Sequence, residues 1–116
     1  MKPKWQKEFE EERARLNEIV SNSGNLGIKR FFALDEKAYD AGALPVKVKE
    51  LMGLAASIVL RCDDCIAYHL VRCREEGVTK EEFYETFNVA LIVGGSVVIP
   101  HLRTAADRIE EMLAGD

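Results

Sequence analysis

The chain has 116 residues, a length that supports one domain with a single hydrophobic core. Hydrophobic residues make up 47% of it and charged residues 31%, and its net charge of −4 gives no reason to expect a nucleic-acid partner. The N-terminus is charged from its second residue and lacks the apolar run of a signal peptide, and no stretch reaches about 18 apolar residues. We therefore expect no membrane partner and a cytoplasmic location.

Apolar residues recur with helical spacing and show almost no strand-like alternation, so the sequence predicts an all-α protein. We expect a single domain over residues 1–116, folded as a compact bundle of about six helices. Residues 44–113 are expected to form the core, and residues 1–42 to serve oligomerisation. The predicted helices span residues 4–20, 26–41, 46–60, 63–76, 79–93 and 96–113.

The ends of the early helices follow from local signals. The first helix carries a thin apolar stripe between charged residues, so we expect a surface helix packed on a partner subunit. A turn cluster at residues 21–25 ends it. Gly42 is predicted as the C-cap of the second helix, and Pro45 is predicted in the first turn of the third.

The later helices also carry recognisable ends. Asp63 or Asp64 is predicted to cap the fourth helix, which stops at Gly77. Thr79 precedes Glu82 by three residues and predicts a capping box on the fifth. The pair at residues 94–95 breaks that helix, and the proline at position 100 is tolerated in the first turn or so of the last.

One motif concentrates the reactive side chains. The stretch Cys62-Asp63-Asp64-Cys65-Ile66-Ala67-Tyr68-His69 holds two of the three cysteines and one of the two histidines. On a helix, Cys65 and His69 are i and i+4 neighbours, and Cys62 lies where the helix begins. An imidazole can take the thiol proton, a helix N-terminus stabilises the thiolate, and a second cysteine can close a disulfide. Three cysteines without a secretory signal argue against a structural disulfide framework, which favours a redox role.

Two other interpretations of the motif stay open. The thiols can be buried small side chains beside a capped histidine, or Cys62, Cys65 and His69 can supply three zinc ligands. Cys73 lies one further turn along the helix from His69, on the same face. The eleven residues from Cys62 to Cys73 span ~16 Å of helix, however, so these two side chains are too far apart to bind one ion. We therefore expect Cys73 to be a buried small hydrophobe, and we expect no metal and no cofactor.

Glu50 lies near the start of the third helix, which is apolar over more than one face, so its carboxylate is expected to be partly buried. If the chain turns near residues 61–62, the third and fourth helices run antiparallel and Glu50 returns toward His69. A carboxylate that orients the imidazole would complete a Glu-His-Cys relay. From spacing alone, a salt bridge from Glu50 to Lys47 or Lys49 is the simpler expectation.

Together, Glu50, eleven intervening residues and Cys62-x-x-Cys65-x-x-x-His69 resemble the alkylhydroperoxidase AhpD-like proteins of the carboxymuconolactone decarboxylase superfamily. Residues 54–57, residues 77–82 and the glycines at 94–95 agree with this resemblance, which covers about residues 44–113.

The resemblance implies an AhpD-like all-helical fold whose subunits assemble into trimers or hexamers. It implies that Cys65 attacks peroxide, that Cys62 is its disulfide partner, and that Glu50 and His69 form the proton relay. AhpD itself usually carries a second histidine between its cysteines, where this chain has Asp63-Asp64. Acidic residues beside the thiols oppose thiolate formation.

The sequence therefore predicts an alkylhydroperoxidase-like thiol oxidoreductase that reduces hydroperoxides or disulfides and is restored by an external dithiol. One alternative is a non-enzymatic oligomeric module that senses redox state or binds a partner. The other is a lactone decarboxylase that uses Glu50 and His69 without the thiols, although members acting on the lactone generally lack this cysteine pair. Repeated consumption of peroxide with a dithiol present distinguishes the enzyme from the sensor.

Overall fold

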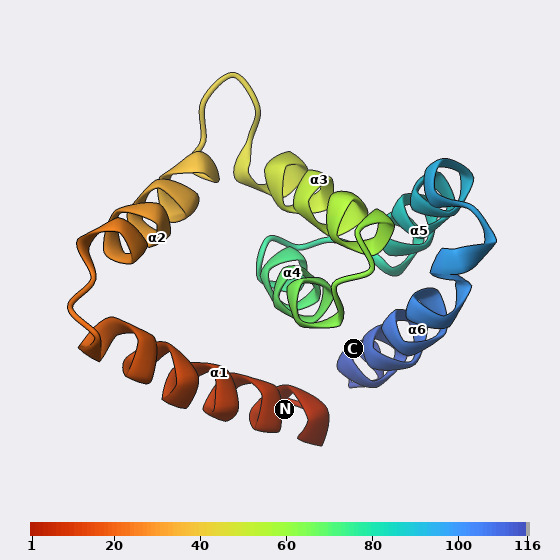
Figure 1. Ribbon diagram of the computed structural model, residues 1–116. Helices are drawn as coiled ribbons and strands as arrows, with labels where there is room; N and C mark the ends of the chain where they lie inside the picture. Colours follow the sequence, from red (N-terminus) through yellow and green to blue (C-terminus); the bar gives the residue numbers. More distant parts are fainter. Residues whose placement is uncertain (116) are drawn as a thin grey trace.

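The computed structural model describes residues 1–115, and they form an all-α bundle, which confirms the fold class expected from the sequence (Figure 1). The elements are α1 (Lys4–Asn22), α2 (Leu26–Ala38), α3 (Val46–Val59), α4 (Asp63–Glu75), α5 (Lys80–Gly94), the short 3₁₀ helix η1 (Ser96–Val98) and α6 (Ile99–Leu113). Within the described residues, no helix is long and apolar enough to cross a membrane.

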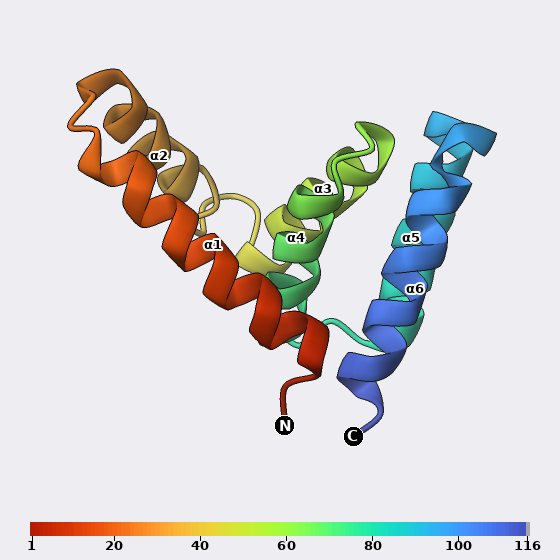
Figure 2. The ribbon, with the colours of Figure 1, turned by 60° about the horizontal axis from the view of Figure 1, so that its bottom comes forward.

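Four helices enclose the hydrophobic core. α3 packs against both α4 and α5, and α6 covers α4 and α5 (Figures 1 and 2). Because α3 is apolar around more than one face, it can lie between two neighbours and bury side chains on both. The core side chains without solvent exposure are Leu54, Ile58, Leu70, Cys73, Phe83, Val98 and Ile109.

α1 and α2 form an arm beside this core, and we call these two helices the arm. In Figure 1 they run away from α3–α6 and fold back, and in Figure 2 α1 crosses in front of α4. α2 buries no residue and α1 buries only Gln6. The start of α1 is tied to α6, since the Arg108 guanidinium lies 5.0 Å from the centre of the Trp5 ring. As expected, α1 is a surface helix of this chain.

Several predicted helix ends are confirmed. At the start of α5, Thr79 Oγ1 accepts the Glu82 amide at 3.2 Å while the Thr79 amide donates to Glu82 Oε1 at 2.8 Å, which is the predicted capping box. Gly77 ends α4 with φ of 79°, a left-handed conformation that costs glycine little. α5 ends at Gly94–Gly95, where the sequence predicted a break.

The predicted end of α2 is wrong. The helix stops at Ala38, and the last carbonyls are capped by Lys49, whose Nζ donates to Ala38 O at 3.1 Å and to Asp40 O at 2.7 Å. Gly42 is therefore not the C-cap; its amide donates to Leu44 O in the following turn.

Two starts also differ from expectation. Pro45 is the N-cap of α3 rather than a residue of its first turn. The last helix begins as η1 and becomes α-helical only at Ile99, with Pro100 in the first positions of α6. A proline is tolerated there because it lacks only an amide that the first turn leaves unbonded.

Candidate functional site

The turn between α3 and α4 sets the position of the cysteines. Arg61 has φ of 58° and ends α3 in a Schellman motif, because the Cys62 amide donates to Ser57 O at 3.1 Å and the Arg61 amide to Ile58 O at 3.0 Å. Cys62 then serves as the N-cap of α4, where its Sγ accepts the Cys65 amide at 3.2 Å. One residue thus closes α3 and opens α4.

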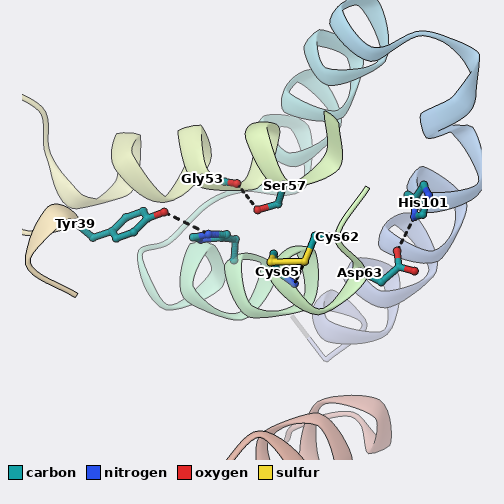
Figure 3. Close-up of a disulfide and its surroundings, with 8 residues drawn as sticks. Tyr39, Gly53, Ser57, Cys62, Asp63, Cys65 and His101 are labelled. Carbon is teal, nitrogen blue, oxygen red and sulfur yellow. Dashed lines mark hydrogen bonds and ion pairs between the residues drawn. A yellow bond between two sulfur atoms is a disulfide. The ribbon is translucent and has the colours of Figure 1, made fainter. Parts of the chain in front are cut away.

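Cys62 and Cys65 form a disulfide within this turn, and their Cα atoms lie 5.2 Å apart (Figure 3). Cys65 is exposed, whereas Cys62 is half-buried. An N-terminal helix position stabilises a thiolate, because the free amides of the first turn point toward the sulfur.

The prediction that Asp63 or Asp64 caps α4 is wrong, because the sulfur of Cys62 occupies that role. Both carboxylates lie in the first turn of the helix. The Asp63 carboxylate accepts a hydrogen bond of 2.7 Å from Nδ1 of His101, which α6 brings over from 38 residues away (Figure 3). Sequence spacing carries no signal for this pair, since only the packing of α6 on α4 creates it.

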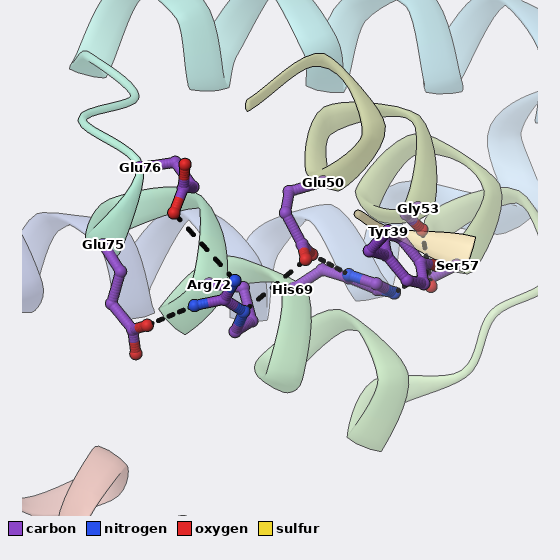
Figure 4. A network of polar contacts seen from close by, with 8 residues as sticks. All are labelled: Tyr39, Glu50, Gly53, Ser57, His69, Arg72, Glu75 and Glu76. Atoms are coloured by element: carbon purple, nitrogen blue, oxygen red, sulfur yellow. Dashed lines mark hydrogen bonds and ion pairs between the residues drawn. The ribbon is translucent and has the colours of Figure 1, made fainter. Parts of the chain in front are cut away.

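Glu50 and His69 meet inside the protein. Because α3 and α4 run antiparallel, Glu50 Oε1 of α3 accepts a hydrogen bond of 2.8 Å from Nδ1 of His69 on α4 (Figure 4). Glu50 is 1% exposed and His69 is 7% exposed. This is the contact that a turn between the helices allowed and that the family resemblance implied. The salt bridge from Glu50 to Lys47 or Lys49, which spacing alone favoured, was a wrong prediction. Lys47 instead pairs with Glu82, and Lys49 caps α2.

Arg72 supports the buried carboxylate from one turn further along α4. Its Nε lies 3.5 Å from Glu50 Oε2, and its guanidinium also pairs with Glu75 and Glu76 on the surface (Figure 4). A buried carboxylate persists as an ion only when it is paired and hydrogen-bonded. Because a carboxylate accepts hydrogen bonds, Nδ1 of His69 is the donor in its contact with Glu50, and the second ring nitrogen, Nε2, faces away from the carboxylate.

Tyr39 reaches the same imidazole from the end of α2. Its hydroxyl lies 3.4 Å from His69 Nε2, and burial, followed by the nearby charges of Asp35 and Glu50, raises the pKa of Tyr39 above its usual value. In the sequence, Tyr39 falls within the predicted helix 26–41. Nothing in its spacing, thirty residues before His69, pointed to this contact.

Cys65, His69 and Tyr39 all line one cavity of about 300 Å³, which we call the thiol cavity. Cys65 and His69 line it from α4, and Tyr39 lines it from just after α2, where it is the C-cap. The arm and α4 complete its wall with Phe9, Arg13, Leu16, Asn17, Asp35, Asp64 and Tyr68.

Cys73 lies outside this cavity. It is a free thiol with no solvent exposure, and burial raises its pKa to about 12. The expectation of a buried small hydrophobe is confirmed. Over residues 1–115, no group of three histidine, cysteine or acidic side chains is arranged to hold a metal ion.

The fold and the site define a class of small all-α proteins with a Cys-x-x-Cys disulfide at a helix start and a buried glutamate–histidine pair. The model of the carboxymuconolactone decarboxylase family matches residues 28–108, and the chain belongs to this family. The resemblance found in the sequence is thereby confirmed. All of α1, Lys4–Asn22, precedes the matched residues, as does the start of α2.

Solved structures share the whole fold. A Thermotoga maritima protein superposes with a TM-score of 0.87 at 56% identity, covering 95% of this chain and 99% of that one. A second T. maritima structure superposes with a TM-score of 0.86 at 60% identity, covering 90% of this chain and 89% of that one. It is a carboxymuconolactone decarboxylase family protein for which an involvement in the antioxidative response is suggested. A Legionella pneumophila family member in its apo form superposes with a TM-score of 0.81 at 25% identity, covering 94% of this chain and 97% of that one.

Two curated relatives are similar in sequence. An uncharacterised protein of Cupriavidus necator is 30% identical over 89 residues, which cover 72% of this chain and 79% of the relative. Uncharacterised protein 4 in the cox locus of Paracoccus denitrificans is 30% identical over 82 residues, which cover 71% of this chain and 74% of the relative.

Proposed function

We propose that this protein is a thiol oxidoreductase that reduces hydroperoxides or disulfides with the Cys62–Cys65 pair, using Glu50 and His69 as a proton relay. The observation that carries the proposal is the shared thiol cavity, because an exposed cysteine of a disulfide and a histidine oriented by a buried carboxylate line one space. The suggested antioxidative involvement of the T. maritima relative agrees with it.

The two sulfurs differ in ways that support different roles. Cys65 is exposed and lines the thiol cavity, so it is the sulfur that a peroxide reaches. Cys62 is half-buried and its sulfur accepts the Cys65 amide. When an external dithiol attacks the exposed sulfur of Cys65, Cys62 leaves as a thiolate that this amide stabilises. A reducing compartment such as the cytoplasm supplies dithiols of this kind.

His69 supplies the base. An unperturbed thiol, with a pKa of about 8.5, is mostly protonated at neutral pH, and the acidic residues at positions 63 and 64 hold it further in that form. The Nδ1–H bond to Glu50 leaves Nε2 able to accept the thiol proton of Cys65, directly or through a water in the cavity.

The test is steady-state consumption of an organic hydroperoxide by the reduced protein with a dithiol present. We expect repeated turnover, loss of all turnover in Cys65→Ser, a fall of about 10²–10⁴-fold in His69→Ala and a smaller fall in Glu50→Gln. Circular dichroism checks that each variant folds, and Cys73→Ser, which changes a buried thiol outside the cavity, is the matched control with unchanged turnover.

Stoichiometric oxidation without turnover would overturn the enzyme proposal and leave a passive disulfide switch. Full activity in His69→Ala would show that the histidine has no part in the chemistry.

A further inference from the structure

The Tyr39 hydroxyl contacts the imidazole of His69 at Nε2, the ring nitrogen that does not face the Glu50 carboxylate. Since Nδ1–H of His69 donates to Glu50, the bond at Nε2 runs from the Tyr39 hydroxyl to the bare nitrogen. At 3.4 Å this bond is long, so the hydroxyl can turn toward another oxygen at little cost.

Gly53 makes this approach available. A Cβ atom at this position of α3 would lie 2.6 Å from Cε1 and 2.8 Å from Nε2 of His69, and 2.8 Å from the Tyr39 hydroxyl (Figure 4). Glycine is a poorer helix former than alanine, so a glycine inside a helix needs a reason. Its place here is explained by the space that the imidazole and the phenol need together.

The phenol also keeps its proton in this environment. Burial and the charges of Asp35 and Glu50 raise the pKa of Tyr39, so a tyrosinate does not form at neutral pH. Tyr39 lines the thiol cavity together with Cys65, so its hydroxyl and the attacked substrate share one space.

We propose that Tyr39 is a further catalytic residue, the acid that protonates the oxygen leaving from the substrate; this rests on the thiol oxidoreductase function proposed above. The Cys65 thiolate bonds to the terminal oxygen of a hydroperoxide, and the O–O bond breaks. Sulfur is oxidised to a sulfenic acid, and the peroxide is reduced, its electron pair leaving on an alkoxide oxygen. The alkoxide takes the Tyr39 proton, and Tyr39 takes the proton that His69 Nε2 had received from the Cys65 thiol. Cys62 then displaces water from the sulfenic acid and closes the disulfide.

Leaving groups distinguish this role from simple support of His69. An alkoxide is a strong base that leaves only with a proton, so its departure needs an acid. Iodide, released when iodoacetamide alkylates the thiolate, and the stabilised thiolate of an aromatic disulfide both leave without one. A structural role for Tyr39 would affect all three reactions alike, because each needs the Cys65 thiolate.

The experiment compares Tyr39→Phe with the wild type in single-turnover reactions of the reduced protein, using tert-butyl hydroperoxide, iodoacetamide and an aromatic disulfide. We expect the hydroperoxide reaction to slow on the order of 10²-fold, and the other two to change less than about twofold. The matched control is Tyr84→Phe, which removes a hydroxyl bonded to Glu110 on the surface and should change none of the three.

Equal slowing of all three reactions would overturn the proposal, because the hydroxyl would then only position His69. An unchanged hydroperoxide rate would overturn it as well. If the wild type does not react with the hydroperoxide, the proposed peroxidase function fails. The role of Tyr39 is then tested with an aliphatic disulfide, whose basic thiolate leaving group needs an acid, whereas the thiolate of the aromatic disulfide does not. If Tyr39→Phe reduces the aliphatic disulfide as fast as the wild type does, the proposed role of Tyr39 is rejected.

Discussion

Two cysteines of α4 have the same thiol group but lie in opposite surroundings, one exposed to solvent and one buried. Cys65 lies in the first turn, exposed and beside the thiol cavity, while Cys73 lies eight residues further on with no exposure. Desolvation disfavours a thiolate, so burial raises the pKa of Cys73 to about 12 and makes it inert. Reactivity in this helix is therefore decided by position along its axis.

We expect iodoacetamide to label Cys62 and Cys65 in the reduced native protein and to leave Cys73 unmodified. Because the pKa of Cys73 is about 12, its thiol stays protonated at pH 9, and labelling there should require unfolding. Mass spectrometry after labelling, with and without denaturant, measures this. Mild peroxide should remove two thiols, those of Cys62 and Cys65. Labelling or oxidation of Cys73 in the native state would contradict the assignment.

Sequence reasoning linked residues whose partners lie within one turn, since the i, i+4 spacing joined Cys65 to His69. For Glu50, a turn between the helices made contact with the imidazole possible, but spacing alone favoured a lysine partner. The family resemblance implied the pairing that the structure contains. Tyr39 and His101 were missed because their partners depend on how α2 and α6 dock, which no local pattern encodes. The capping sulfur of Cys62 was missed because aspartate is the commoner cap.

At the scale of elements, the close approach of α3 to α4 organises the site. α3 presents Gly53 where the imidazole and the phenol lie, and its last turn feeds directly into the cap of α4. The exact end of α2 was not predicted, because the cap comes from the side chain of Lys49, eleven residues after Ala38.

Gly53→Ala tests this packing. Alanine gains about 1 kcal/mol in helix propensity, but forcing a methyl group against the imidazole costs about 1–3 kcal/mol, so we expect a small net loss in the free energy of unfolding. Displacement of His69 should slow alkylation of Cys65 about tenfold or more. Urea titration and iodoacetamide labelling measure the two effects.

The control is Gly42→Ala, where a Cβ would meet only Lys49 Nζ, at 3.9 Å. Labelling in this variant should match the wild type. Unchanged labelling of Cys65 in Gly53→Ala would mean that the added methyl group does not disturb His69. It would contradict the role assigned to Gly53 in the site.

At the scale of the whole molecule, the arm makes the chain less compact than its length requires. The radius of gyration is 14.8 Å, against about 13 Å for a compact domain of this length. α2 presents Phe31 at 68% exposure without burying any residue, and Ile92 at the end of α5 is 78% exposed. Large apolar side chains gathered on open helices are typical of subunit interfaces.

We therefore propose a homo-oligomer, with a hexamer favoured by the family resemblance. Light scattering at micromolar concentration should give a mass several times the 13.0 kDa of the chain. Phe31→Asp and Ile92→Asp should each lower that mass, because a charge in an apolar interface is costly to bury. Lys29→Asp, a charge change on the same helix as Phe31, is the control. A wild-type protein of monomeric mass would contradict the proposal.

The placement of the disulfide in a single turn has a consequence for repeated use. Its two cysteines are three residues apart, and a cross-link over so short a loop removes little chain entropy, so opening it withdraws little support from the fold. The turn between α3 and α4 is closed by backbone hydrogen bonds from Arg61 to Ile58 and from Cys62 to Ser57, which do not depend on the S–S bond. In the proposed reaction, the Cys62–Cys65 pair can therefore gain and lose two electrons while the packing of α3 against α4 stays the same.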